Sequence, residues 1–213
     1  MPEVKVTWLG HACFELECKD YKIIIDPYKD VRGYSDVKAK AHEVICSHEH
    51  FDHNYRDGVE ILPKAKSPFT VDVIHSFHDD AGGRLRGTND INIFTVGRVN
   101  KIKIVHLGDI GCELGEDNMM KIGKADCVMI PIGGTYTINA EAANTLLKRI
   151  APKVIIPMHY RIQSLGFAEL QNIEDFVKLR DDAVRYETNS LILNGNNTSE
   201  CAVLKYKKYW SKK

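Results

Sequence analysis

Residues 48–53 form the segment His-Glu-His-Phe-Asp-His, which constrains the chain more than any other feature. It follows an apolar stretch that we expect to be a buried strand. In an extended segment residues i and i+2 point to the same side, so His48 and His50 can bind one cation. If the chain then turns, Asp52 and His53 can hold a second cation about 3.5–4 Å away. A polar loop that merely carries histidines is the alternative, but three histidines within six residues greatly exceed ordinary usage.

Length and composition indicate one globular domain over residues 1–213. The chain is 44% hydrophobic and 27% charged, which is typical of a soluble protein, and no segment suggests a linker. No apolar run approaches the ~20 residues of a membrane helix, and the N-terminus lacks the layout of a signal peptide. We therefore expect no membrane insertion and a cytoplasmic location, and the sequence leaves a homo-oligomer open.

Charge and cysteine usage exclude further classes. Basic and acidic residues number 29 each, which removes the electrostatic attraction behind most nonspecific nucleic-acid binding, so nucleic acid is not an expected partner. The six cysteines form no Cys-x-x-Cys pair and are interpreted as reduced core residues. Cys46 is close enough to the histidine segment to be a ligand, although its place inside the strand favours the core.

Hydrophobic periodicity predicts strands first and a mixture of strands and helices later. Strands are expected over residues 4–9, 12–16, 21–25, 44–46, 68–74, 92–96, 102–106, 128–131, 154–157, 191–193 and 202–204. Helices are expected over residues 116–122, from an Asn139 cap to Ile150, and over 169–179. The last two strands flank an Asn194-Gly195 turn. This order suggests two sheets with helices outside.

Several predicted strands end near a residue that can bind metal. Besides His48, these are His78, Asp109 and His159. Asp109 follows a glycine and carries two oxygens, so it can bridge two cations. His75 lies three residues before His78 and is an equally close competitor.

The motifs and their order resemble the metallo-β-lactamase superfamily. The resemblance rests on His-x-His-x-Asp-His together with Gly10-His11, Ile24–Pro27, His78–Asp80, Arg86-Gly87-x-Asn89, His106–Asp109 and Pro157–Tyr160. The chain is most similar to the branch of metal-dependent hydrolases that includes ascorbate-6-phosphate lactonase. The resemblance implies an α+β fold, a four-layer αββα sandwich with metals at one edge of two sheets. It also favours His78 over His75.

Two ligand sets follow from the resemblance. One metal is expected to bind His48, His50 and His78, the other Asp52, His53 and His159, with Asp109 shared. Asp52 and Asp109 are the expected catalytic residues. The donors suit two divalent transition-metal ions, with Zn or Mn favoured and Fe, Ni or Co compatible.

Five further residues are candidates for supporting the metals or binding substrate: His11, Asp26, Arg86, Asn89 and Tyr136. Asp26 could fix a ligand histidine or simply cap a strand. Arg86 would favour an anionic substrate, or it is a surface arginine. His11 is a candidate pocket contact, whereas His106 is expected to be core.

The expected function is hydrolysis of an ester, lactone or phosphoester of a small substrate that can be anionic. A hydroxide held by the two cations would be nucleophilic at neutral pH, and Asp52 would orient it. The same superfamily hosts phosphodiesterases and nucleases, which is the first alternative. A non-hydrolytic metal-binding or redox module is the second.

Overall fold

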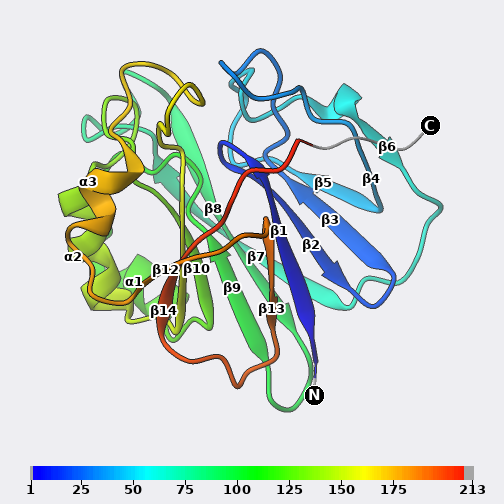
Figure 1. The fold of residues 1–213 in the computed structure, drawn as a ribbon. Coiled ribbons are helices and arrows are strands. Elements are labelled where there is room, and N and C mark those ends of the chain that lie inside the picture. Colours follow the sequence, from blue (N-terminus) through cyan, green and yellow to red (C-terminus); the bar gives the residue numbers. More distant parts are fainter. Residues whose placement is uncertain (1, 209–213) are drawn as a thin grey trace.

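Two β-sheets that lie face to face form the centre of the molecule (Figure 1). The computed structural model describes residues 2–208. The first sheet has the order β13 (Ser190–Leu193), β1 (Val4–Gly10), β2 (Cys13–Cys18), β3 (Tyr21–Ile25) and β5 (Glu43–Ile45). The second has the order β12 (Ala183–Arg185), β14 (Glu200–Val203), β11 (Val154–Met158), β10 (Cys127–Pro131), β9 (Ile102–His106), β8 (Thr88–Val96) and β7 (Phe69–Phe77).

The hydrophobic core fills the space between the sheets. Trp8, Phe14 and Ile23 are buried, and the Phe14 ring lies 5.8 Å from that of His106 on β9 of the opposite sheet. Successive strand residues point to opposite faces, so the neighbour Glu15 faces outward. There the Lys22 Nζ atom contacts its carboxylate. Each large apolar side chain buried in this way contributes about 1.5–3 kcal/mol. The first strands occur where the sequence predicts them, and β1 and β2 are buried along nearly their whole length.

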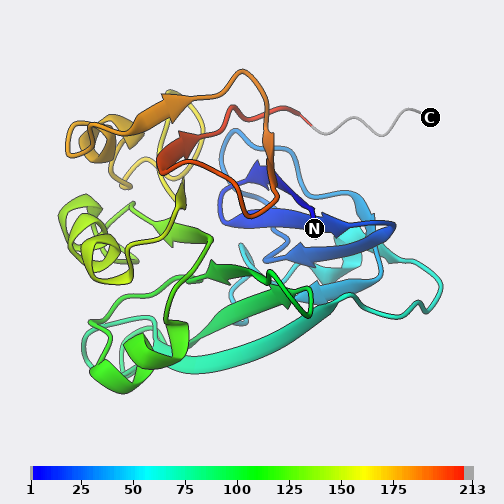
Figure 2. The same ribbon diagram turned by 90° about the horizontal axis from the view of Figure 1, so that it is seen from below.

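Helices cover one outer side of the two sheets. They are α1 (Glu116–Ile122), α2 (Ala140–Ile150) and α3 (Ile173–Val177), and all lie beyond the seven-stranded sheet (Figures 1 and 2). Beside β3 lie the paired strands β4 (Ala39–Ala41) and β6 (Val59–Ile61) and the 3-10 turn η1 (Arg56–Gly58). Two sheets with helices outside are confirmed, but within residues 2–208 the helices cover only one of the two outer faces. None of these helices is long and apolar enough to span a membrane.

Helix α2 has the bounds that the sequence predicts. The Asn139 side chain accepts a hydrogen bond of 2.9 Å from the Ala142 amide and so caps the first turn. The apolar face, which includes Leu147 and Ile150, is buried. Ala151 adopts a left-handed conformation directly before Pro152, which ends the helix.

Helix α3 is shorter than the predicted 169–179. Its cap is Asn172, which forms a capping box with Asp175. The preceding residue is held outside the helix, because the Gln171 amide donates to the Gly133 carbonyl at 2.8 Å. A contact distant in sequence thus determines where this helix begins.

The predicted Asn194-Gly195 hairpin is wrong. Strand β13 pairs with β1 in the first sheet, whereas β14 pairs with β11 and β12 in the second. The segment between them crosses from one sheet to the other (Figure 1). Both strands exist where predicted, but their partners are not each other.

Candidate metal centre

The predicted ligands meet at one edge of the sheets, where strands from both sheets end. Segment 48–53 follows β5 of the five-stranded sheet. His78 follows β7, Asp109 follows β9 and His159 follows β11, all in the seven-stranded sheet. Any metal bound between these groups would therefore have donors from both sheets.

A first cluster contains His48, His50 and His78, whose ligand atoms lie within 4.8 Å of one another. Burial and then the neighbouring His53 charge lower the pKa of His48 to about 3. Burial and then His78 lower the pKa of His50. Both imidazoles are thus neutral at pH 7 and have a nitrogen lone pair available for a cation.

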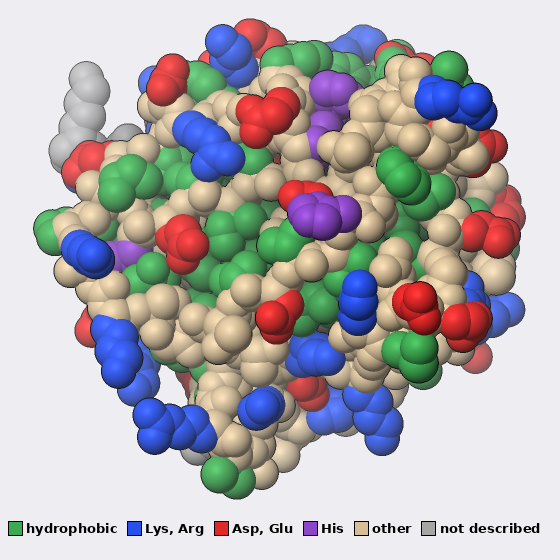
Figure 3. Space-filling view, turned by 180° about the vertical axis from the view of Figure 1, so that it is seen from behind, with side chains coloured by type: hydrophobic (Ala, Val, Ile, Leu, Met, Phe, Trp, Pro, Cys, Tyr) green, Lys and Arg blue, Asp and Glu red, His purple; other side chains and the backbone are tan. Residues whose placement is uncertain are grey.

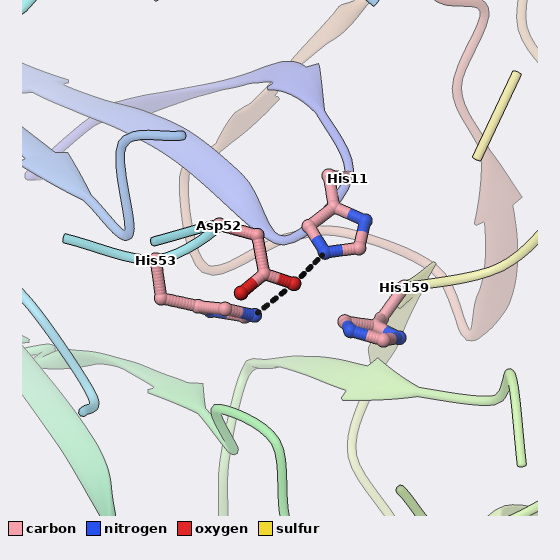
Figure 4. Close-up of side chains that lie close together, drawn as sticks. All are labelled: His11, Asp52, His53 and His159. Atoms are coloured by element: carbon pink, nitrogen blue, oxygen red, sulfur yellow. Dashed lines mark hydrogen bonds and ion pairs between the residues drawn. The ribbon is translucent and has the colours of Figure 1, made fainter. Parts of the chain in front are cut away.

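A second cluster contains Asp52, His53, His159 and His11, again within 4.8 Å (Figure 4). The Asp52 carboxylate lies between the rings of His11 and His53, and its Oδ2 is 3.3 Å from His11 Nε2. Burial and then His159 lower the pKa of His11 to about 4. The sequence suggested His11 only as a pocket contact, and the structure places it among the donors, fully buried.

Asp109 lies at the centre of both clusters. Its Oδ2 is 3.1 Å from His53 Nε2, 3.1 Å from His159 Nε2 and 3.2 Å from His78 Nε2. Burial alone would raise its pKa, but the charges of His159 and His53 hold that pKa well below its ordinary value. The ionised carboxylate therefore lies within 3.2 Å of histidines from both clusters.

Several buried polar atoms in these clusters have no hydrogen-bond partner within residues 2–208. They are His48 Nε2, His53 Nε2, His159 Nε2 and Asp109 Oδ1, together with Nδ1 of three histidines. A buried unsatisfied polar group costs about 1–3 kcal/mol. A divalent cation between these atoms would remove this penalty, so the residues fit a metal.

Asp26 supports one histidine of each cluster. Its Oδ2 accepts from His53 Nδ1 at 2.8 Å and from Ser47 Oγ at 2.6 Å, and its Oδ1 accepts from the Ser47 amide at 2.6 Å. Ser47 Oγ in turn lies 2.9 Å from His48 Nδ1 and can accept its proton. Both imidazoles thus carry a proton on Nδ1 and leave Nε2 free. The structure favours the supporting role of Asp26 over a simple strand cap.

Asn89 is buried and supports the Asp109 loop. Its Oδ1 accepts from the Asp109 amide at 2.7 Å, and its Nδ2 donates to the Leu107 carbonyl at 2.9 Å. A Cβ on Gly108 would lie 2.2 Å from Asn89 Oδ1, and Gly108 has φ +55°. Of the two roles considered for Asn89, positioning fits the structure and substrate contact does not.

Three residues at strand ends of the site have positive φ. His11 has φ 51°, Asp26 has φ 47° and His159 has φ 53°. Such a conformation costs a non-glycine residue roughly 1–2 kcal/mol. The His159 amide donates to the His11 carbonyl at 3.2 Å, which holds the two strand ends together across the sheets.

Three alternative candidates lie outside the clusters. His75 is exposed, and its Nδ1 lies 2.7 Å from the Asp90 carboxylate, so it does not face the site as His78 does. The Cys46 thiol donates to Asn54 Oδ1 at 3.3 Å, and burial raises its pKa to about 12. His106 is buried with Nε2 donating to a backbone carbonyl, as expected of a core histidine.

A cavity of about 530 Å³ opens above the clusters, which is within the range of small-molecule sites. Its lining consists of Glu49, His50, Phe51, Asp52, His78, Arg86, Asp109, Tyr136, His159, Phe167 and Glu169. Of the predicted substrate-binding candidates, the structure places Arg86 and Tyr136 here.

The sequence missed five residues that support or line the site, which are Ser47, Glu49, Phe51, Phe167 and Glu169. Ser47 lies directly before the histidine segment, and only its contact with Asp26 reveals its role. Phe51 lies inside the segment 48–53, where an aromatic residue among the histidines was the available signal in the sequence. The structure leaves its ring exposed. Phe167 and Glu169 lie in or beside a loop whose composition carries no signal, and they reach the cavity through the fold.

Comparisons with known proteins agree with this geometry. The family model of the β-lactamase superfamily domain matches residues 5–159. A UPF0173 metal-dependent hydrolase of Archaeoglobus fulgidus is 28% identical over 215 residues, covering 83% of this chain and 92% of the relative. A UPF0173 protein of Pyrococcus abyssi is 28% identical over 188 residues, covering 78% of this chain and 88% of the relative.

A solved structure from Thermotoga maritima, a candidate Zn-dependent hydrolase of the metallo-β-lactamase superfamily, is similar over nearly the whole chain. The TM-score is 0.75 with 30% identity, covering 96% of this chain and all (100%) of the other. The α+β fold of the metallo-β-lactamase type is thus confirmed. By the extent of the family match and of this similarity, the chain belongs to the metal-dependent hydrolases of the β-lactamase superfamily.

Proposed function

We propose that this protein hydrolyses an ester, lactone or phosphoester of a small substrate that can be anionic, with two divalent transition-metal ions, Zn or Mn. One observation carries the proposal. The buried Asp109 carboxylate lies between two clusters of histidine side chains, on the floor of a cavity large enough for a small molecule. We treat residues 1–213 as one hydrolase domain, since one core unites both sheets.

Each residue of the centre has an assigned role in this proposal. His48, His50 and His78 hold one cation, and Asp52, His53 and His159 hold the other, with Asp109 between them. Bound divalent cations supply Lewis acidity and lower the pKa of a coordinated water toward ~7. The N/O donor set is compatible with Zn, Mn, Fe, Co and Ni.

Asp52 is positioned to orient the attacking water. It lines the cavity, and its Oδ2 can accept a hydrogen bond from His11 Nε2 at 3.3 Å. Burial opposes ionisation, but the His11 hydrogen bond and the His53 charge lower the Asp52 pKa. Asp52 therefore stays a carboxylate that accepts a proton or a hydrogen bond. His11 fixes its orientation.

Surface charge supports a small substrate over a polynucleotide. On the face shown in Figure 3, basic and acidic side chains lie among one another in the upper and middle parts, and basic side chains are more frequent near the lower edge. Such a surface lacks the single-sign stripe that binds a phosphate backbone. The six cysteines are unpaired, which supports a reducing compartment, and we propose the cytoplasm.

The test combines metal analysis with an activity panel. Protein purified without added metal is analysed for bound metals and assayed on chromogenic esters, lactones and phosphodiesters. Activity should disappear when EDTA is added and return when one kind of metal ion is added back. Asp109→Asn should lose both metal and activity, and His75→Ala, which changes an exposed histidine, should lose neither. Full activity of the folded Asp109→Asn protein would overturn the proposal.

A further inference from the structure

We propose that Arg86 binds an anionic group of the substrate at the rim of the cavity, so that the preferred substrates carry a carboxylate or phosphate apart from the bond that is cleaved. This rests on the proposed hydrolase function and names the substrate class. Arg86 is the only lysine or arginine among the described residues that line the cavity. Within residues 2–208, no carboxylate oxygen lies within 4.0 Å of its guanidinium nitrogens.

Two contacts fix the guanidinium without neutralising it. Arg86 Nη2 donates to the Thr135 carbonyl at 3.2 Å. The guanidinium carbon lies 4.8 Å from the centre of the Tyr136 ring, in a cation–π contact. A guanidinium has five N–H donors, so most remain available to a ligand.

The loop that carries Arg86 is organised around one carboxylate. Asp79 accepts backbone hydrogen bonds from Ala81, Gly83, Leu85 and Arg86, at 2.7–3.1 Å. These bonds lower the pKa of Asp79 despite the opposing effect of burial. The loop starts directly after His78, so its position is fixed relative to the metal centre. Less ordering is then required when a ligand binds.

The acidic residues at the rim are each held by a hydrogen bond from a neutral side chain, and neither carboxylate lies within 4.0 Å of the Arg86 guanidinium nitrogens. Glu169 accepts from the Tyr136 hydroxyl, and Glu49 accepts from the Asn54 side chain. The lining also includes the aromatic rings of Phe51 and Phe167, which are 6.4 Å apart. The Phe167 ring lies 6.3 Å from that of Tyr136, which contacts Arg86, and 5.6 Å from that of His11. The cavity thus suits a short molecule with an apolar middle and an anionic end.

A matched pair of esters tests this charge preference. Ethyl butyrate and ethyl hemisuccinate have the same leaving group and acyl length, and differ by a terminal methyl or carboxylate. Their hydrolysis is followed by the acid released. Arg86→Gln removes the charged hydrogen bond between the guanidinium and the substrate carboxylate. This loss should lower kcat/KM for the hemisuccinate by about 10- to 100-fold. Activity on the butyrate should change less than about twofold.

Arg84→Gln is the matched control, because Arg84 is an exposed arginine of the same loop that does not line the cavity. It should leave both esters unchanged. Asp79→Asn should act like Arg86→Gln, with a higher KM for the hemisuccinate and little change for the butyrate. An equal effect of Arg86→Gln on both esters, or the same selective loss in Arg84→Gln, would overturn the proposal.

A binding measurement separates this inference from the proposed function. Monomethyl succinate and methyl butyrate are titrated into EDTA-treated protein and followed by NMR. The anion should bind more tightly than the neutral ester, and Arg86→Gln should remove the difference. If the loaded protein cleaves neither ethyl ester, the proposed function fails on these substrates, and the titration still decides the role of Arg86. Equal binding of the two ligands to the unaltered protein refutes that role.

Discussion

Asp26 is not a predicted metal ligand, yet its replacement should weaken metal binding by both clusters. In Asp26→Asn, one carboxylate oxygen becomes an NH₂ group. If that group replaces Oδ2, it faces the protons of His53 Nδ1 and Ser47 Oγ. If it replaces Oδ1, it faces the Ser47 amide at 2.6 Å. Neither orientation satisfies all three donors. In the first, His53 Nδ1 loses its acceptor, so its proton can move to Nε2 and block metal binding. In the second, the Ser47 amide loses its acceptor directly before His48, so the segment that carries His48 is displaced.

The magnitude follows from the position of Asp26 behind the ligands. Loss of a group that orients a ligand histidine typically costs 10- to 100-fold in metal affinity, or roughly 1.4–2.7 kcal/mol. The effect on His53 is direct, and the effect on His48 passes through Ser47. We therefore expect Asp26→Asn to weaken both binding steps, and Ser47→Ala to weaken mainly the step that involves His48.

Competition with a chromophoric chelator, on protein first stripped with EDTA, gives the two dissociation constants. Glu15→Gln is the matched control, since Glu15 is also a buried, hydrogen-bonded carboxylate of the five-stranded sheet but lies on its outer face. Circular dichroism establishes that each variant is folded. Unchanged dissociation constants in a folded Asp26→Asn protein would refute this account of the two imidazole tautomers.

Further predictions concern the third histidine of the first cluster, the Asp109 loop and the core. His78→Ala should lose about one metal equivalent by elemental analysis, whereas His75→Ala should retain both, and the reverse result would reinstate His75. Gly108→Ala should lower the free energy of unfolding by about 1–3 kcal/mol and reduce metal content, because its Cβ would lie 2.2 Å from Asn89 Oδ1; an unchanged urea midpoint would contradict this. Burial lowers the pKa of His106 below its ordinary value, so below about pH 6.5 the unfolded chain binds a proton that folded His106 does not, and stability falls as pH falls. The measurement is urea unfolding of EDTA-treated protein at pH 7.5 and at pH 5.5. Between these pH values the free energy of unfolding should fall by roughly 1 kcal/mol less in His106→Gln than in the unaltered protein. An equal fall in both proteins would exclude His106 as the cause.

The sequence predicted most side chains of the candidate metal centre because they come from short motifs at strand ends. The segment 48–53 contributes to both clusters without any long-range information. His78, Asp109 and His159 needed the order of motifs along the chain, and the structure brings all three to the same edge. Their roles as ligands remain predictions for metal analysis.

Features that depend on contacts between distant segments were not predictable. Strand β13 pairs with β1, nearly the whole chain length away, so the local Asn194-Gly195 signal gave the wrong partner. The start of α3 depends on a bond between Gln171 and Gly133. Asn89 belongs to a motif whose residue types suit substrate binding, but its neighbours on β7 and β9 enclose it.

The arrangement of donors has a mechanical consequence. A cation shared between segment 48–53 and residues such as Asp109 or His159 would cross-link the two sheets at the edge where they are otherwise joined by few backbone contacts, among them the bond from His159 to His11. Occupancy and rigidity would then rise together, since binding to the folded state alone adds about 2.7 kcal/mol of stability at a free metal concentration of 100 Kd. Metal supply would set the heat resistance of the protein as well as its capacity for chemistry.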